Sequence, residues 1–249
     1  MEPTQIKTKD TEYSFKRYEE KYLLSPDMYA AFMDSAGGRL VPDEYFESRI
    51  CSLYYDTDDY SLIINSLERP VYKEKLRVRI YGNQGRDGTA FVELKKKYKG
   101  VVYKRRVETT PERAEKWISG ETPAPFDTQI TREIDWFLKM NRVSPKMMIS
   151  CDRISWKDRD DARLRFTFDR NILYRETELD LCLGAYGEPL LKEGYSLLEI
   201  KIPEAAPLWL ASLLSNEDIF PTSYSKYGNA YTKKIMEEKE LQESFNYDI

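Results

Sequence analysis

Two arginines at alternate positions of one short stretch are the first residues whose spacing suggests chemistry. The stretch is KLRVRIYG, residues 75–82, and as a β-strand it places Arg77 and Arg79 on one face and its apolar residues on the other. Like charges side by side on a strand repel each other unless something anionic lies between them. On a single strand, a charged face is more often simply exposed to solvent. The interpretation therefore depends on whether the pattern recurs.

The pattern does recur in other predicted strands, several of which have an apolar opposite face. The like-charged neighbours at positions i and i+2 are Arg77/Arg79, Lys104/Arg106 and Arg163/Arg165. The acid–lysine neighbours with the same spacing are Glu19/Lys21, Glu93/Lys95 and Glu199/Lys201. Taken together, these faces favour a site for an extended polyanion over a series of solvated faces. We predict phosphate binding by their cations, including Arg163, Arg165 and Lys201.

The carboxylates of the acid–lysine pairs are candidate metal ligands. The sequence has no histidine, and its three cysteines are widely spaced. This excludes histidine-dependent catalysis and histidine-ligated zinc, and it does not suit a disulfide framework. Carboxylate oxygens favour Mg²⁺ or Mn²⁺, which bridge phosphate oxygens in phosphoryl-transfer sites. We therefore predict Glu19, Glu93 and Glu199 as ligands of Mn²⁺ or Mg²⁺.

Composition limits the class of protein. The chain has 249 residues and a net charge of −4, so a basic site must be a local concentration of Lys and Arg within an acidic protein. A nucleic-acid reader is disfavoured, because tracking a nucleic-acid backbone needs an open basic surface. No apolar run is long enough to span a bilayer, and the first residues lack a basic-then-apolar signal. We expect a soluble, cytoplasmic protein without direct membrane insertion.

The chemistry-bearing residues belong to a series of predicted strands. Eight strands are predicted at Phe15–Leu24, Glu47–Asp56, Lys75–Gly82, Thr89–Tyr98, Val101–Thr109, Lys146–Trp156, Ala162–Asp169 and Tyr195–Ile202. A ninth is indicated at Leu179–Tyr186. An antiparallel sheet of about eight strands can close into a barrel that holds side chains or one ligand. We predict an α+β fold: an antiparallel, eight-stranded, tunnel-like β-barrel with a charged interior and helices packed on the outside.

The predicted helices lie between these strands. Ser25 and Pro26 start one helix that Gly37 ends, and Thr110, Pro111 and Gly120 repeat the design. Further helices are predicted at Asp58–Leu67, Thr128–Lys139, Ala205–Leu214 and Lys226–Ser244. Without an internal repeat or a low-complexity linker, residues 1–249 are predicted to form one domain. Its core covers about 15–233, and 1–12 and 240–249 are predicted to be flexible.

Nine short segments along the chain resemble a known family. They are YEEKYLL, SLYYDT, KLRVRIYG, FVELKKK, VVYKRR, CDRISW, ARLRFTFD, LLEIKI and SYSKYGNAY, between Phe15 and Lys233. In this order they are similar to the polyphosphate polymerase domain of the vacuolar transporter chaperone (VTC) family. That family belongs to the triphosphate tunnel metalloenzyme, or CYTH-like, superfamily.

The resemblance implies a function and roles for particular residues. Polymerases of this family transfer the γ-phosphate of ATP to a growing inorganic polyphosphate chain inside a basic tunnel, with Mn²⁺ or Mg²⁺. By motif position, Lys21 is expected in the first strand of the tunnel, Arg77 and Arg79 are expected to grip the triphosphate, and Arg153 matches a family arginine near the transferred phosphate. The resemblance implies that these four residues are catalytic. Further phosphate ligands are expected at Lys95, Lys104, Arg106 and Lys226. Glu199 matches the metal-binding glutamate of the family.

The sequence departs from the family pattern at two positions, and functions other than polymerisation stay open. Ser223 stands where the eukaryotic polymerases have a second lysine, which weakens one contact to the product. Arg17 stands where related triphosphatases have the first glutamate of the first strand, which argues against a two-metal hydrolase. The alternatives to an ATP-dependent polymerase are a triphosphatase or polyphosphatase of the same fold, and a non-catalytic polyphosphate-binding module.

Overall fold

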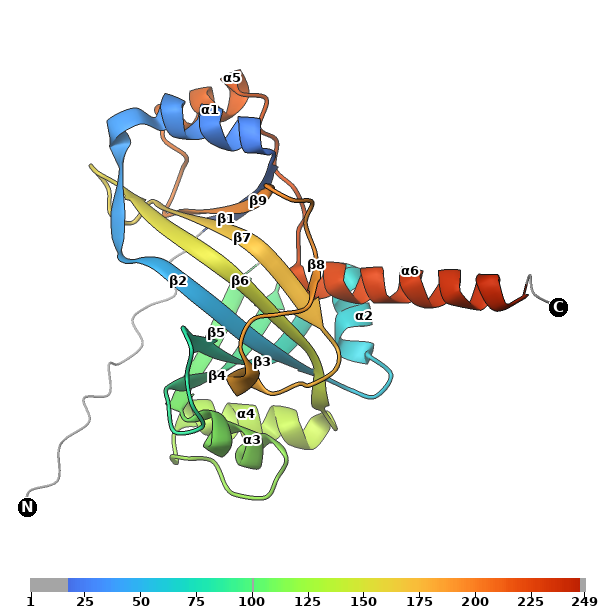
Figure 1. Cartoon of the computed structure of the whole chain (residues 1–249). Coiled ribbons are helices and arrows are strands. Elements are labelled where there is room, and N and C mark those ends of the chain that lie inside the picture. Colours follow the sequence, from blue (N-terminus) through green and yellow to red (C-terminus); the bar gives the residue numbers. More distant parts are fainter. Residues whose placement is uncertain (1–17, 100, 247–249) are drawn as a thin grey trace, which may run out of the picture.

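The computed structural model describes the backbone of residues 18–99 and 101–246, and the side chains of this part up to residue 238 (Figure 1). The predicted flexible segment 1–12 lies outside the described residues, and so do Arg17 and the predicted beginning of the first strand. Of the predicted flexible segment 240–249, residues 240–246 continue the last helix and 247–249 lie outside the described part.

One antiparallel sheet of nine strands forms the centre of the molecule. Its main path runs in the order β1-β9-β7-β6-β2-β3-β4-β5, and β8 pairs with β7. The strands are β1 (Tyr18–Leu24), β2 (Leu40–Asp56), β3 (Tyr72–Tyr81), β4 (Ala90–Tyr98), β5 (Val101–Thr109), β6 (Ser144–Asp158), β7 (Arg165–Arg175), β8 (Glu188–Pro189) and β9 (Ser196–Ile202). The predicted antiparallel α+β fold is therefore confirmed.

The sheet is strongly curved, so that its two ends approach each other (Figure 1). Glu19 of β1 and Lys95 of β4 lie 3.9 Å apart, although five strands separate β1 from β4 along the sheet. Within the described residues no backbone ladder joins β1 to β5, so the hydrogen-bonded sheet is open there. In the described part, the side-chain contact between Glu19 and Lys95 connects the two ends of the sheet. The curvature gives the sheet an inner and an outer face.

The outer face near β3 and β4 is apolar and covered by two helices. α3 (Pro111–Ile118) and α4 (Gln129–Met140) lie below these strands in Figure 1 and bury side chains against them, including Trp117 and Phe137. Leu76, Val78 and Ile80 of β3 belong to the same cluster, each at most 1 % exposed. Burial of each such side chain contributes about 1.5–3 kcal/mol. Strand alternation then places the neighbouring arginines on the inner face.

A second pair of helices covers the outer face at the other end of the sheet. α1 (Pro26–Ala36) and α5 (Leu208–Asn216) pack over β7 and β9, where Phe166, Phe168 and Ile200 are fully buried. The predicted start of α1 is confirmed, because the Ser25 hydroxyl accepts a hydrogen bond from the backbone N–H of Met28. In β7 and β9 too, alternation leaves the charged residues on the inner face.

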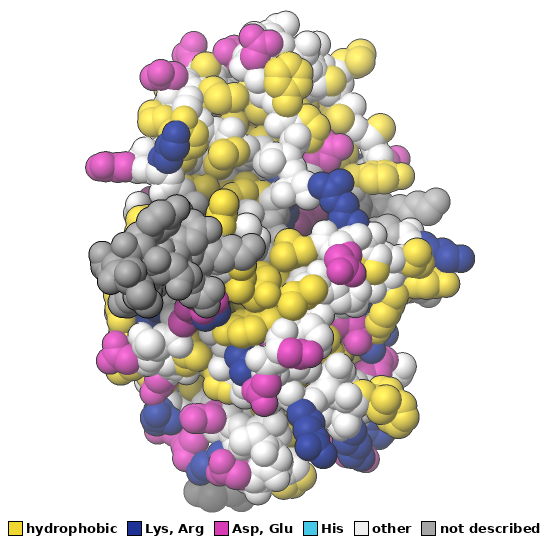
Figure 2. All heavy atoms as spheres, turned by 90° about the vertical axis from the view of Figure 1, so that its right-hand side faces the viewer, with side chains coloured by type: hydrophobic (Ala, Val, Ile, Leu, Met, Phe, Trp, Pro, Cys, Tyr) yellow, Lys and Arg dark blue, Asp and Glu magenta, His cyan; other side chains and the backbone are white. Residues whose placement is uncertain are grey.

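α2 (Ser61–Leu67) and α6 (Lys226–Asn246) meet at one end of the curved sheet. Asp56 ties both helices to β2: it accepts hydrogen bonds from the backbone N–H groups of Leu62 and Ile63, and its Oδ2 lies 2.8 Å from the hydroxyl of Tyr227. The Tyr227 ring stacks on Tyr54 of β2 at 4.7 Å. Figure 2 views the molecule from this side and shows hydrophobic side chains gathered near its centre. These contacts hold the beginning of α6 against the inner face.

Three predicted strands differ clearly from the structure. β2 begins at Leu40 and not at the predicted Glu47. β7 begins at Arg165 and runs to Arg175, so Arg163 lies in the preceding turn and not in a strand. The ninth strand predicted at Leu179–Tyr186 is wrong, because this segment contains a short 3-10 helix instead. Arg175 donates hydrogen bonds to four backbone carbonyls of residues 178–186, which occupies acceptors that a strand ladder would need.

No helix of the described part has both the length and the apolar character needed to cross a membrane.

Candidate functional site

The inner face of the sheet carries two groups of ion-paired residues. The first, the Glu93 cluster, consists of Glu93 with Arg77, Lys104 and Arg106. The second, the Asp169–Glu199 cluster, consists of Asp169 and Glu199 with Lys21, Arg153 and Lys226. The Glu93 cluster comes from the consecutive strands β3, β4 and β5, whereas the Asp169–Glu199 cluster combines residues that are far apart in the sequence.

Glu93 is bound by three cations although it is only 1 % exposed. The cross-strand register places it between Arg77 of β3 and Arg106 of β5. Arg77 Nη2 lies 2.7 Å from Oε2, and Lys104 Nζ and Arg106 Nε lie 2.7 and 2.8 Å from Oε1. Charge-assisted hydrogen bonds of this length are strong and directional. Glu93 therefore holds the three cations in defined positions.

The electrostatics of the Glu93 cluster keep the carboxylate charged. Burial alone would raise the pKa of Glu93, but Arg77, Arg79 and Lys104 outweigh it and hold this pKa far below its usual range. Burial also lowers the pKa of Lys104 to about 8. The Glu93 carboxylate is thus a weak base that positions cations.

Arg79 is a buried cation on the same face as Arg77. It is 9 % exposed, and no carboxylate of the described part lies within ion-pair distance of it, although Glu93 is near enough for Arg79 to lower its pKa. Its Nε donates to the Ser52 hydroxyl at 3.0 Å, which is a neutral acceptor. Buried charges are normally paired, because removing an unpaired charge from water is costly. Arg79 therefore points to an anionic ligand.

Tyr54 of β2 belongs to this region although its aromatic character suggests only a structural role. Arg77 Nη1 donates to the Tyr54 hydroxyl at 2.9 Å. Burial opposes ionisation of the phenol, but Arg77 and Arg79 outweigh this effect and lower the pKa of Tyr54 to about 8. The shift reports a strongly positive potential at this point of the inner face.

In the Asp169–Glu199 cluster, two buried carboxylates share three cations. Arg153 binds Asp169 at two points, with Nε–Oδ1 and Nη2–Oδ2 distances of 2.6 and 2.7 Å. Lys226 pairs with Asp169, and its Nζ lies 3.5 Å from Glu199 Oε1. Lys21 Nζ approaches the same oxygen at 3.3 Å. The cluster joins β1, β6, β7, β9 and the first residue of α6.

The cations also determine the charge states of this cluster. Burial raises the pKa values of Asp169 and Glu199, but Lys226 and Arg153, with Lys21 at Glu199, lower both well below the usual range. Burial would lower the pKa of Lys226, yet the two carboxylates raise it. The two carboxylates and Lys226 are therefore charged at neutral pH.

The inner face offers one carboxylate pair that suits a divalent cation. No group of three His, Cys, Asp or Glu side chains within the described residues could by itself hold a metal. Glu19 and Glu199, however, both flank Lys21, at 4.0 and 3.3 Å. Mg²⁺ is commonly held by one or two carboxylates together with substrate phosphates. Glu19 and Glu199 match that donor set. The cations contact Glu199 at 3.3–3.6 Å, whereas they bind the Glu93 oxygens at 2.7–2.8 Å and leave them less available to a metal.

Most predicted site residues meet on the inner face, and three lie away from the two clusters. Arg163 lies in the turn before β7 and pairs with Asp161 at 2.9 Å, so the predicted same-face pair with Arg165 is wrong. Arg165 starts β7 and pairs with Asp43 at 3.3 Å. Lys201 lies opposite Arg165 in the register, toward the same end of the sheet.

Sequence reasoning missed four residues of the site, namely Tyr54, described above, and three others. It treated Asp169 as a strand end, but Asp169 is fully buried and binds both Arg153 and Lys226. Lys73 and Lys75 extend the alternation of Arg77 and Arg79 toward the beginning of β3. The alternating cations of KEKLRVR carried the signal for the two lysines. No local pattern marks Asp169, because its partners are far away in the sequence.

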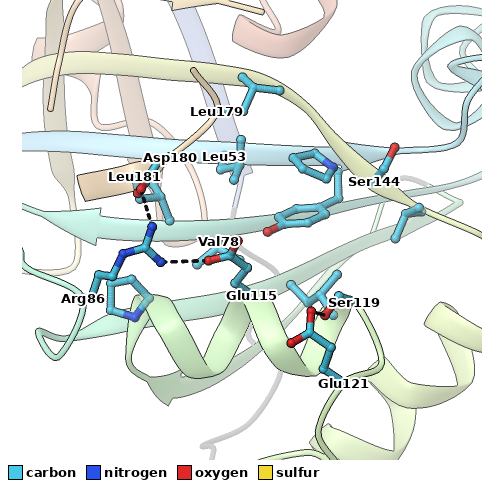
Figure 3. A pocket seen from close by; sticks show the side chains of 15 residues that line it. Leu53, Val78, Arg86, Glu115, Ser119, Glu121, Ser144, Leu179, Asp180 and Leu181 are labelled. Atoms are coloured by element: carbon cyan, nitrogen blue, oxygen red, sulfur yellow. Dashed lines mark hydrogen bonds and ion pairs between the residues drawn. The ribbon is translucent and has the colours of Figure 1, made fainter. Parts of the chain in front are cut away.

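A separate cavity of about 250 Å³ lies on the outer face (Figure 3). Its lining combines apolar side chains such as Leu53 and Val78 with a rim on which Arg86 binds both Asp180 and Glu115, at 2.7 and 3.2 Å. The cavity faces α3 and is remote from the inner-face cations. With more acids than cations on its rim, it does not suit a phosphate ligand.

A curved antiparallel sheet with cations and carboxylates on its inner face is the arrangement that the resemblance of the sequence motifs led us to expect. Residues 16–235 match the VTC domain, which is most of the chain. The chain therefore belongs to the VTC domain family, as its sequence motifs indicated. This membership supports a function related to polyphosphate or triphosphate.

One solved structure shows the same fold at low sequence identity, and two others are similar to a lesser degree. A "putative adenylate cyclase" from Bacillus halodurans is 14 % identical with a TM-score of 0.53, covering 83 % of this chain and 92 % of that one. A protein of the same description from Vibrio parahaemolyticus is 11 % identical, with a TM-score of 0.46 and coverages of 88 % and 99 %. A Pyrococcus horikoshii protein is 10 % identical, with a TM-score of 0.45 and the same coverages. No curated protein matches the chain in sequence.

Proposed function

We propose that this protein is a phosphotransferase that builds inorganic polyphosphate from ATP. The observation that carries the proposal is the buried Arg79, a cation without a carboxylate partner among the described residues, at the centre of a cationic inner face. Around it, the ion-paired inner-face residues include more cations than carboxylates. A bound chain of phosphates would supply the missing negative charge. The proposed partners are ATP and inorganic polyphosphate, and not nucleic acid.

The proposed reaction needs position and positive charge more than a side-chain nucleophile. An oxygen of the acceptor's terminal phosphate attacks the γ-phosphorus of ATP in line, the bond to the β–γ bridging oxygen breaks, and ADP leaves. Arg77 and Arg79 hold the triphosphate, and Lys104 and Arg106 extend the same binding surface. Lys21, Arg153 and Lys226 neutralise charge near the acceptor and the transferred group. The carboxylates of the clusters keep these cations in place.

A divalent cation belongs to this proposal. Glu19 and Glu199 are the residues that would hold it, together with phosphate oxygens of the substrate. When bound, Mg²⁺ or Mn²⁺ would neutralise charge on the β- and γ-phosphates. Lys21 lies between the two carboxylates and would contact the same phosphate oxygens.

Transfer to a phosphate acceptor does not require a carboxylate base. Hydrolysis profits from a general base that activates water, and such a base works best with a pKa near the working pH. The buried carboxylates Glu93, Asp169 and Glu199 have pKa values held far below neutral by their cations, and are therefore weak bases. A phosphate acceptor is already anionic and needs no base.

The proposal is tested by product analysis of the purified chain and matched variants. The chain is incubated with ATP and Mn²⁺, and the products are separated on a gel that resolves polyphosphate. We expect long phosphate chains and ADP from the wild type, and loss of most product with Arg79→Gln. Arg105→Gln is the control, because Arg105 lies on the outer face and binds Glu133 of α4. Orthophosphate without polymer would contradict the proposal and indicate a hydrolase.

A further inference from the structure

The row of inner-face cations does not end at the Glu93 cluster. Along β3 and β4 the register pairs Lys75 with Lys95 and, one step closer to α2, Lys73 with Lys97. These residues have the same strand parity as Arg77 and Glu93, whose side chains meet on the inner face. The two lysine pairs therefore face the same side, and we call these four residues the lysine ladder.

The lysine ladder has almost no carboxylate partners in the described part of the chain. Lys73, Lys75 and Lys97 form no ion pair there, and Lys95 reaches only Glu19, at 3.9 Å. Lys73 Nζ donates instead to the backbone carbonyl of Ser66 at 3.1 Å, and Lys75 Nζ donates to the hydroxyl of Ser225 at 3.0 Å. Like charges directly opposite each other on neighbouring strands are destabilising.

The outer face of the same strands shows the opposite arrangement. Lys96, the residue between two ladder lysines, lies within 3.6 Å of Glu74 and 3.9 Å of Glu133. Arg105 on the neighbouring strand binds Glu133 at 2.8 Å. The chain thus supplies carboxylates for the outer-face cations of this hairpin and leaves the inner-face lysines without them. Lys95 and Lys97 are exposed to solvent and Lys73 and Lys75 are partly buried, so the two faces of the hairpin differ in their ion pairs and not in their exposure.

The electrostatic surroundings of the ladder agree with this picture. Burial lowers the pKa of Lys75 to about 8, and Lys73, Lys95 and Lys21 add to the effect. Burial likewise lowers the pKa of Lys73, with further contributions from Lys97 and the exposed Arg69 next to α2. The dominant charged neighbours of Lys73 are therefore cations, and an anion beside them would relieve the repulsion.

We propose that the lysine ladder binds the phosphates of a linear polyphosphate beyond the triphosphate held at the Glu93 cluster, and leads the chain out past α2 toward Arg69. This inference rests on the proposed function and adds a length-dependent subsite. Successive rungs are two residues apart, which is about 7 Å along a strand. A tripolyphosphate at the Glu93 cluster leaves the outer rung empty, whereas a longer chain contacts both rungs.

The test compares two ligands of the same chemistry and different length. The dissociation constants of tripolyphosphate and of long-chain polyphosphate are measured by isothermal titration calorimetry at one fixed ionic strength. The variant is Lys73→Gln/Lys97→Gln, which removes the outer rung. We expect its tripolyphosphate affinity to stay within about twofold of the wild type, while long-chain affinity falls at least about tenfold, equal to 1.4 kcal/mol.

Two further variants separate the ladder from a general charge effect. Lys96→Gln/Arg105→Gln removes the same charge from the outer face of the same hairpin, and we expect little loss of long-chain affinity. Lys73→Arg/Lys97→Arg keeps the charge and should keep most of the long-chain affinity. Thermal unfolding of each variant shows that it is folded.

The possible results also separate this inference from the proposed function. If Lys73→Gln/Lys97→Gln and Lys96→Gln/Arg105→Gln weaken long-chain binding equally, the proposed role of the lysine ladder is contradicted. Unchanged long-chain binding by Lys73→Gln/Lys97→Gln would contradict it as well. In both cases tripolyphosphate binding by the wild type would leave the proposed function standing. A wild type that binds neither ligand would overturn both.

Discussion

Arg153 of β6 and Asp169 of β7 form a two-point ion pair across neighbouring strands, with N–O distances of 2.6 and 2.7 Å. Asp169 has no solvent exposure, and Lys226 of α6 binds it as well. The pair therefore does more than join two strands. It connects the centre of the sheet to the helix that carries the last cation of the site.

Removing the Asp169 charge should destabilise the fold. Asp169→Asn leaves two buried cations with a neutral partner, and breaking a buried ion pair in this way typically costs about 3–5 kcal/mol. We expect a loss of this size in the free energy of unfolding, measured with urea. The control is Asp161→Asn, which removes the carboxylate from the exposed pair with Arg163 and should cost less than about 1 kcal/mol. Similar losses in both variants would contradict the role assigned to Asp169.

Sequence reasoning predicted the fold well because the strands alternate clearly. β5 begins and ends where the pattern predicted, and the apolar positions of β3 and β9 identify the outer face. Arg77, Glu93 and Arg106 come from strands joined by short connections, so their meeting follows from simple hairpin pairing.

The parts that could not be predicted depend on long-range packing. Asp169 acquires its role from Lys226, 57 residues away in the sequence. The beginning of β7 depends on Asp161 and Arg163, which form a turn where the alternation suggested a strand. The opening between β1 and β5 depends on how far the sheet curves, and no local pattern encodes that.

Glu93 should make stability depend on pH in the acid range. Its pKa in the folded protein lies below the usual 4.5, so its stabilising contribution is present above pH 4.5 and is lost as the pH falls further. We expect Glu93→Gln to be less stable than the wild type at pH 7, and the difference between them to shrink below about pH 4.5. Urea unfolding at several pH values measures this difference. A difference that is constant with pH would contradict an ionised, cation-bound Glu93.

Arg77 should resist replacement by lysine. Its planar guanidinium binds Glu93 and the Tyr54 hydroxyl at the same time, which a lysine ammonium cannot reproduce with the same geometry. We expect Arg77→Lys to weaken tripolyphosphate binding at least about tenfold, equal to 1.4 kcal/mol. Arg105→Lys, the same exchange on the outer face, should leave the affinity unchanged. If both variants bind tripolyphosphate equally well, Arg77 contributes only its charge, and the shape of its guanidinium does not matter.

Tyr54 provides a spectroscopic reporter of the site. The arginines beside it lower its pKa to about 8, so one tyrosine should ionise about two pH units earlier than an ordinary tyrosine. A pH titration of the phenolate absorption should show this step in the wild type and not in Tyr54→Phe. Bound tripolyphosphate should move the step to higher pH, because an anion near the arginines disfavours the phenolate. If the pH of this ionisation step does not change when tripolyphosphate is added, phosphate binds elsewhere.

The central claim is that the cationic inner face joins phosphate to phosphate. Phosphorus NMR of the purified chain with ATP and Mg²⁺ tests it most directly, because a phosphate bonded to two others gives a signal distinct from those of ATP, ADP and orthophosphate. We predict that this internal-phosphate signal grows in step with ADP, and that Arg79→Gln loses most of it. Growth of the orthophosphate signal alone, or an unchanged ATP spectrum, would contradict the claim.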